Sequence, residues 1–166
     1  MNGIVNCGED IPGFRYDPTE DYAVRAYKLG IFMPFMRAHS NMLSFNREPS
    51  FFKEFDIIKN AIIMRYKLIP YIYSLFFEAW SIKVPLIRPI WLEFPGFGHG
   101  LEDQFMFGYA FLLKPICNNY SKGTIIQFPT HTIWNDCFND FAFISQDQIE
   151  YNYEGIDKFH LFIKCG

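Results

Sequence analysis

The character of the chain changes near residue 87, and this change constrains the fold more than any other feature of the sequence. Before it, short apolar runs alternate with helical patterns, which is the order of parallel βαβα units. After it, Pro, Gly and Asn separate short β-like runs, a pattern typical of a β-sandwich. Two βα units are too few to close a sheet, so we expect residues 1–86 to need further strands.

Two apolar runs in the first half are candidate strands. The run from Ile4 to Cys7 has the composition of a strand that ends in a loop, because glycines and prolines follow as far as Pro18. Residues 31–36 are apolar on both faces, as in a buried parallel strand, although Pro34 counts against a central position. We expect each strand to end in a polar loop.

Two segments show helical periodicity. The first extends from Thr19 to Leu29; Thr19 can cap its first turn, and its apolar stripe begins at Tyr22. The second extends from about residue 54 to 80, with apolar side chains at spacings of three and four. Pro70 should kink this helix because proline removes a backbone donor.

Five segments of the second half are expected to contain strands, because apolar residues lie between turn signals there. They are residues 87–94, 104–115, 124–128, 132–134 and 158–164. Between the first two, Gly96 to Gly100 superficially resembles a glycine-rich phosphate loop. Without a strand before it and a helix after it, a surface turn is the better interpretation.

Composition and missing motifs exclude several classes of function. The net charge is −3 and no long basic patch occurs, so no nucleic-acid partner is expected. No apolar run reaches the ~18 residues that a membrane span needs. The four cysteines form no C-x-x-C pair and no metal or cofactor motif occurs, so neither group is expected. Asn119-Tyr120-Ser121 fits the glycosylation sequon, a pattern that often arises by chance.

Polar residues follow both candidate strands, and in βα proteins function gathers at the carboxyl ends of strands. Glu9 and Asp10 follow the first strand, and Arg37 and His39 follow the second. Arg37 and His39 are two residues apart, so on extended backbone they point to the same side. Such donors and acceptors could hold sugar hydroxyls. The alternatives are a structural histidine, a structural Arg37–Asp10 ion pair and a simple loop charge at Glu9.

Several short blocks occur in a recognisable order. They are residues 7–14 (CGEDIPGF), 25–30 (RAYKLG), 34–39 (PFMRAH), 47–49 (REP), 65–73 (RYKLIPYIY), 88–95 (RPIWLEFP) and 103–108 (DQFMFG). With these blocks the chain resembles glycoside hydrolase family 31, the α-glucosidase family. The resemblance is strong from about residue 7 to 116, and residues 162–166 (FIKCG) are similar to a later strand.

The resemblance implies a fold of the α/β plus all-β class. Residues 1–86 would form the C-terminal part of a (β/α)8 barrel and supply its last two βα units. Residues 87–166 would form the proximal, incomplete part of a C-terminal β-sandwich domain. This division agrees with the change of character near residue 87.

The resemblance also implies retaining hydrolysis of α-glycosidic bonds, with one carboxylate as nucleophile and a second as acid/base. The motifs that carry those carboxylates are absent here, so no catalytic residue is expected and the chain alone should be inactive. His39 corresponds to a family histidine that hydrogen-bonds the sugar at the point of cleavage. Arg37 and Asp10 correspond to residues of the same pocket, and Phe14 to an aromatic near its rim.

The substrate implied by the resemblance is a terminal α-linked glucose of an oligosaccharide or N-glycan. Glu48 and the FMRAH block at residues 35–39 are most similar to the endoplasmic-reticulum branch of the family. That branch would add a regulatory beta subunit as a partner and the lumen of the endoplasmic reticulum as the compartment.

Some residues depart from the family pattern. Ala26 and Ser50 stand where Trp is usual, Pro12 replaces a small residue and Cys165 replaces Gly. The lost aromatics leave space that must be filled, which suggests a diverged lineage. Two alternatives therefore stay open: a non-catalytic carbohydrate- or partner-binding β-sandwich module, and a non-functional truncation with an unpaired sheet edge.

Overall fold

The computed structural model describes residues 4–116, 123–138, 141–144, 148–152 and 160–165. The chain divides into two compact units, one from Asn2 to Leu86 and the other from Ile87 onward. We describe each unit by itself. Residues 119–121, which contain the glycosylation sequon, lie outside the described residues.

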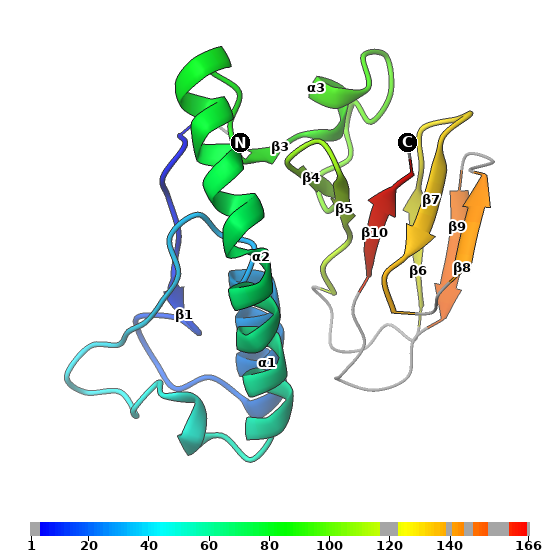
Figure 1. The fold of residues 1–166 in the computed structure, drawn as a ribbon. Coiled ribbons are helices and arrows are strands. Elements are labelled where there is room, and N and C mark those ends of the chain that lie inside the picture. Colours follow the sequence, from blue (N-terminus) through cyan, green and yellow to red (C-terminus); the bar gives the residue numbers. More distant parts are fainter. Residues whose placement is uncertain (1–3, 117–122, 139–140, 145–147, 153–159, 166) are drawn as a thin grey trace. The chain divides into compact units, whose positions relative to one another are not determined.

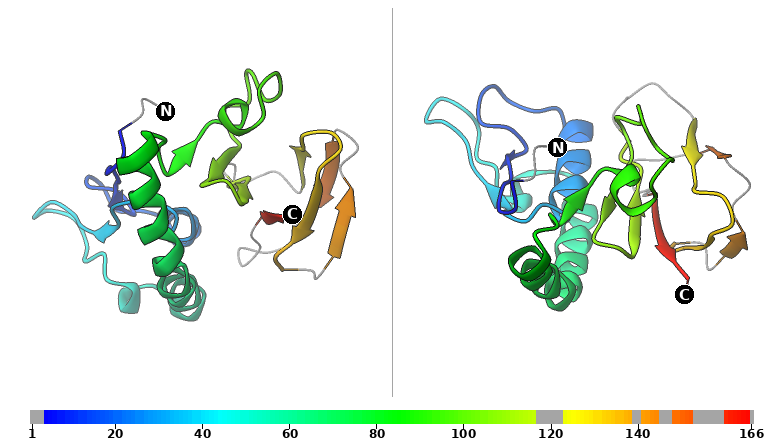
Figure 2. Two further views of the ribbon diagram at one scale, coloured as in Figure 1. Left: turned by 45° about the horizontal axis from the view of Figure 1, so that its top comes forward. Right: turned by 90° about the horizontal axis from the view of Figure 1, so that it is seen from above.

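The first unit has the βαβα order that its sequence predicts (Figure 1). Its elements are β1 (Asp10–Ile11), α1 (Glu20–Gly30), β2 (Arg37–Ala38), a 3-10 helix (Pro49–Phe51) and α2 (Phe55–Ile82). Strands β1 and β2 pair in parallel, with Asp10 opposite Arg37 and Ile11 opposite Ala38. Helix α1 lies against α2, as both views in Figure 2 show.

Both strands of this unit begin later than predicted. Residues 4–7 are not a strand, and residues 31–35 form turns and bends. The second run cannot extend because its carbonyls have other partners. Arg65 of α2 donates to the carbonyls of Ile31 and Met33, each at 2.7 Å, and to that of Pro34 at 3.2 Å. The two runs still lie side by side, since the Phe35 N–H donates to the Cys7 carbonyl at 3.2 Å.

The two long helices confirm the predicted Thr19 cap and the predicted helical periodicity. Thr19 is the N-cap of α1, and its hydroxyl accepts from the Tyr22 N–H at 3.3 Å. Tyr22, the first residue of the predicted apolar stripe, is 52% exposed, whereas Ala23, Val24 and Tyr27 are buried. Helix α2 continues through Pro70 and buries one face, formed by Ile58, Ala61, Leu68, Ile72, Leu75 and Ala79.

The second unit is mainly antiparallel β-structure. It contains β3 (Ile87–Arg88), α3 (Ile90–Glu93), β4 (Phe105–Phe107), β5 (Phe111–Leu113), β6 (Gly123–Gln127), β7 (Ile133–Asp136), β8 (Phe141–Ile144), β9 (Gln148–Asn152) and β10 (Leu161–Lys164). One sheet has the order β3-β4-β5-β10-β7-β8, and β6 pairs with β9 in a second. Their shared core includes Met106, Leu112, Phe128, Trp134 and Phe162.

The predicted strand over 87–94 is only partly present. Ile87 and Arg88 are a strand, but Pro89 is the N-cap of a short helix that takes up Ile90 to Glu93. Strands β8 and β9 were not predicted from the sequence. Among the residues that the structure describes, no helix is both long and apolar enough to cross a membrane. The described residues also contain no cluster of His, Cys, Asp and Glu suited to a metal ion.

Candidate functional site

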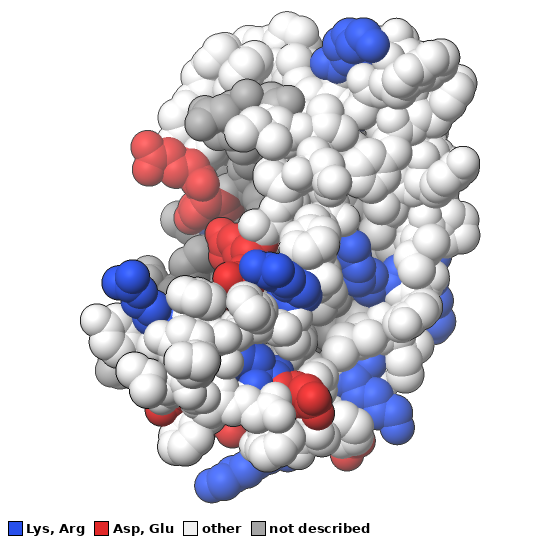
Figure 3. Space-filling model, turned by 90° about the vertical axis from the view of Figure 1, so that its left-hand side faces the viewer, with Lys and Arg blue, Asp and Glu red and all other residues white. Residues whose placement is uncertain are grey.

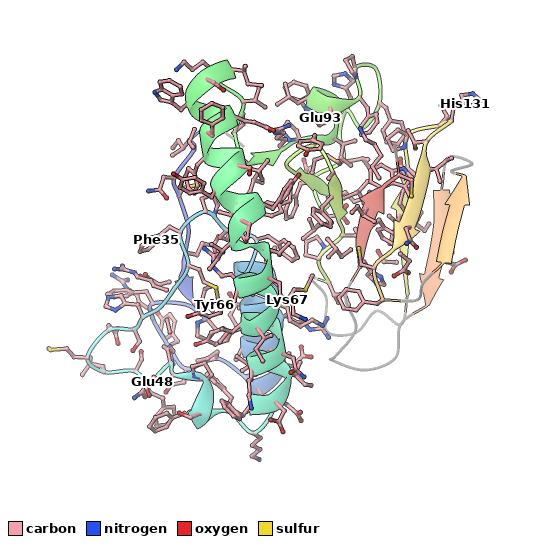
Figure 4. The ribbon with its side chains drawn as sticks, in the orientation of Figure 1. Phe35, Glu48, Tyr66, Lys67, Glu93 and His131 are labelled. Carbon is pink, nitrogen blue, oxygen red and sulfur yellow. The ribbon has the colours of Figure 1, made fainter. Side chains whose placement is uncertain are left out.

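The parallel pair β1–β2 brings two of the predicted site residues into contact. Asp10 and Arg37 are partners in the register, and the Arg37 Nε donates to the Asp10 Oδ1 at 2.6 Å. The Arg37 side chain is 50% exposed and that of Asp10 is 22% exposed. The Arg37 guanidinium also lies 5.7 Å from the centre of the Phe35 ring, a side chain labelled in Figure 4. The pair therefore holds charge at the surface, where solvent and ligands can reach it.

The other two predicted residues meet just beyond the strand ends. The His39 N–H donates to the Ile11 carbonyl at 3.2 Å, which extends the parallel pairing by one bond. The Phe14 and His39 rings have centroids 5.5 Å apart and are tilted by 33°. Phe14 is 43% exposed, and the Asn41 N–H fixes its backbone by donating to its carbonyl at 3.0 Å. All four predicted residues thus lie on two short neighbouring segments.

This arrangement offers the chemistry that a polyhydroxylated ligand requires. The imidazole of His39 can donate and accept, the Arg37 guanidinium donates, and the Asp10 carboxylate accepts. The exposed ring of Phe14 offers an apolar face beside them. Glu9 is exposed, and no described contact joins it to this group. On the face drawn in Figure 3, acidic and basic side chains lie interspersed among uncharged ones.

A buried arginine, which is not among the predicted site residues, supports the loop that carries Phe14. Arg47 is only 2% exposed. Its guanidinium donates to the Gly13 carbonyl at 3.2 Å, to the Asp17 Oδ1 at 3.3 Å and to the Tyr16 carbonyl. Its neighbour Glu48, labelled in Figure 4, is exposed. The one available signal was the position of Arg47 in the REP block.

Tyr27 of α1 connects this arginine to the helix layer. Its hydroxyl donates to the Arg47 carbonyl, and its ring meets that of Phe52 edge-on at 6.2 Å. Burial raises the pKa of the Tyr27 hydroxyl to about 12, an effect opposed by the positive charge of Arg47 and reinforced by Glu48. The phenol therefore stays a neutral donor over the whole physiological range.

The glycine-rich stretch of the second unit is a surface turn, as the sequence suggested. It follows the short helix α3, and Gly96, Gly98 and Gly100 all have positive φ angles. The turn places the His99 ring against Trp91, with centroids 5.9 Å apart and planes 5° from parallel. This flat aromatic pair is exposed, with Trp91 43% accessible.

Family models match both halves of the chain. Residues 1–75 match the TIM-barrel domain of glycosyl hydrolases family 31, and residues 83–166 match the C-terminal domain of the same family. The chain belongs to glycoside hydrolase family 31. The resemblance inferred from the sequence blocks is thereby confirmed.

Curated relatives of this family 31 chain are α-glucosidases. It is 38% identical to neutral alpha-glucosidase C of Homo sapiens over 147 residues, which are 86% of this chain and 16% of that protein. It is 34% identical to neutral alpha-glucosidase AB of Mus musculus over 139 residues, 81% of this chain and 15% of that protein. The chain thus spans less than a fifth of the length of these relatives.

Solved structures agree with these relatives. The glucosidase II alpha subunit bound to Glc1Man2 superposes with a TM-score of 0.85 at 29% identity, over 95% of this chain and 18% of that one. A heterodimer of the catalytic subunit with the binding domain of the regulatory subunit gives the same TM-score of 0.85. A cycloalternan-degrading enzyme from Trueperella pyogenes, at 21% identity and a TM-score of 0.89, supports the fold alone.

Proposed function

We propose that this family 31 chain is part of a retaining α-glucosidase that removes terminal α-linked glucose from an oligosaccharide or N-glycan. The observation that carries the proposal is the cluster formed by Asp10 and Arg37, which are paired in β1 and β2, with His39 and Phe14 just beyond these strands. In βα structures this end of the strands forms the active site. The α-glucosidase names of the relatives support the same reaction.

Each of the four residues has a distinct role in this proposal. His39 hydrogen-bonds sugar hydroxyls at the point of cleavage. Arg37 donates to the same ring, and Asp10 holds Arg37 in position through the 2.6 Å bond. Phe14 covers the sugar with its exposed face at the rim. Because the Arg37 side chain of this pair is half exposed, Asp10→Asn should cost less than about 1 kcal/mol of stability while weakening sugar binding.

The catalytic carboxylates belong, in this proposal, to other strands of the barrel. Retention needs two carboxyl groups about 5–5.5 Å apart on opposite sides of the scissile bond. Asp10 is already engaged by Arg37 on the neighbouring strand. The isolated chain should therefore bind sugar weakly, with a Kd of about 1 mM or above, and release no product.

Histidine NMR gives a direct test, because the chain has four histidines and two of them report on different places. We expect 1-deoxynojirimycin to shift the imidazole signals of His39 and to leave those of His99 unchanged. His39→Ala should abolish binding, and the matched variant His99→Ala should preserve it. An unchanged His39 signal at saturating ligand would refute the sugar site.

Turnover is a separate measurement on the same protein. We expect no release from a chromogenic α-glucoside by the purified chain. Release that disappears in His39→Ala would show that a catalytic pair exists within these residues, contrary to the proposal. Release that persists in His39→Ala would indicate a contaminating enzyme.

A second candidate function is carbohydrate binding by the β-rich unit. The stacked, exposed Trp91–His99 pair favours it, since sugars pack against flat aromatic surfaces. The same titration separates the two candidates. A shift of His99 with loss of binding in Trp91→Ala, and no effect of His39→Ala, would support this second function.

A regulatory beta subunit is a further proposed partner of the whole protein, supported by the heterodimer among the similar structures. We assign no particular surface of this chain to that contact. Co-purification of the whole protein with such a subunit would test the assembly.

A further inference from the structure

We propose that Arg47 is a positioning residue of the sugar site. Its buried guanidinium holds the 13–17 loop in the shape that presents Phe14 to His39. The role in sugar binding rests on the proposed function. The clamp on the loop does not, because it concerns contacts within the chain.

The contacts of Arg47 converge on one target. A guanidinium that is only 2% exposed must satisfy its donors within the protein, because an unpaired buried charge is costly. All three of its nitrogens donate to acceptors of the 13–17 loop: two backbone carbonyls and the Asp17 carboxylate. The carbonyls belong to Gly13 and Tyr16, on either side of Phe14. Arg47 therefore bonds the loop on both sides of Phe14.

The loop has a conformation that needs such support. Gly13 has a φ of 128° and Tyr16 a φ of 61°. A positive φ at a bulky residue such as Tyr16 is a rarely adopted conformation that surrounding contacts must hold. The Arg47 bond to the Tyr16 carbonyl acts on this strained residue. Without that bond we expect the loop to relax and Phe14 to leave its place.

The backbone of Arg47 is itself fixed by a contact with α1. The Tyr27 hydroxyl donates to its carbonyl, and Tyr27 is 2% exposed on α1. Asp17 also accepts from the Phe45 N–H at 2.8 Å, which ties the loop to the segment before Arg47. The clamp is thus a fixed part of the α1 layer.

The ring contact between Phe14 and His39 provides a spectroscopic test that a general loss of stability would not reproduce. A nearby aromatic ring displaces the imidazole signals, and Phe14→Leu removes that ring. With histidine-labelled protein, we expect the His39 signals in Arg47→Met to lie close to the positions that they have in Phe14→Leu. The matched control is Arg88→Met, which removes an arginine that is 3% exposed from the other unit. It should leave His39 at its wild-type position.

The position of the His39 signals in Arg47→Met decides the proposal. His39 signals that stay at wild-type positions in Arg47→Met overturn the proposal. If Arg47→Met unfolds the first unit, so that His39 moves to its unfolded position, Asp17→Asn decides instead. That variant keeps the buried guanidinium and weakens one bond of the clamp at an acceptor that is 41% exposed. It should move His39 in the Phe14→Leu direction, and no movement would overturn the proposal.

Adding 1-deoxynojirimycin to the same samples separates the clamp from the function. We expect Arg47→Met and Phe14→Leu to weaken binding by about the same factor. If the wild-type chain binds no ligand while Arg47→Met still moves His39, the proposed function fails and the clamp stands. If the wild type binds and Arg47→Met binds equally well, Arg47 is not a positioning residue for the site.

Discussion

Replacing Tyr27 by Phe tests the contact that joins α1 to Arg47. The Tyr27 hydroxyl is buried and donates to the Arg47 carbonyl, and the substitution removes that hydroxyl without changing the ring. A buried carbonyl that loses its donor costs about 1–2 kcal/mol. We therefore expect Tyr27→Phe to lower the free energy of unfolding by that amount near neutral pH.

The contribution of the Tyr27 hydroxyl to the free energy of unfolding should fall as the pH rises. Burial raises the pKa of the Tyr27 hydroxyl from 10.0 to about 12, against the charge of Arg47 and with help from Glu48. A group with a higher pKa in the folded state contributes stability that is complete below pH 10 and is lost as the pH rises through 12. This pKa difference corresponds to roughly 3 kcal/mol, of which about half has gone at about pH 11. Tyr27→Phe has no such loss.

The stabilities of the wild type and Tyr27→Phe should therefore converge at about pH 11. Urea unfolding followed by far-ultraviolet circular dichroism measures this, because both long helices belong to the unit that contains Tyr27. Tyr22→Phe is the matched control, on the same helix and 52% exposed, and should follow the wild type. Curves for wild type and Tyr27→Phe that stay parallel up to the highest pH would refute the assignment of the alkaline loss to Tyr27.

Two further predictions concern packing in each unit. A Cβ at Gly30 would lie 2.1 Å from the Ile11 Cδ1, so Gly30→Ala should cost about 1–3 kcal/mol. Ile11→Val removes that methyl, and the double variant should be more stable in urea than the sum of the two single changes. Gln104 is 2% exposed and its amide bonds the N–H and the carbonyl of Gln127, at 3.0 and 2.9 Å. Gln104→Ala should therefore cost about 2–4 kcal/mol, read from the fluorescence of the buried Trp134, and an unchanged transition would count against it.

The helices could be predicted from the sequence because their signals are local. Thr19 caps α1 within its own first turn, and the buried face of α2 recurs at regular spacing along one segment. The strands of the first unit could not be bounded this way. Their limits depend on which carbonyls are free to pair, and Arg65, far along the chain, bonds those of Ile31, Met33 and Pro34. Strand β9 contains two residues, Gln148 and Asn152, of types common in loops, and the apolar run of β8 is only four residues long, so neither gives a strong strand signal.

The candidate site also has one part that the sequence predicts and one part that it does not. That Asp10 and Arg37 face each other follows from parallel pairing of consecutive βα units, so their contact could be anticipated. The dependence of Phe14 on Arg47 could not. The guanidinium bonds backbone carbonyls 34 and 31 residues earlier in the chain, and backbone acceptors leave no trace in side-chain patterns. A charged residue in a polar loop would ordinarily be taken as solvated.

Under the proposed function, sugar binding and turnover should separate in this chain. Phe14, His39 and the Arg37–Asp10 pair lie on or just beyond two neighbouring strands, so in the proposed site they contact the sugar from one side. Retaining cleavage needs carboxyl groups on both sides of the scissile bond. One wall can supply hydrogen bonds and a ring face, and these give weak affinity. It cannot supply attack on one side together with proton donation on the other. Under the proposed function, we therefore expect sugar binding that depends on His39, without product release.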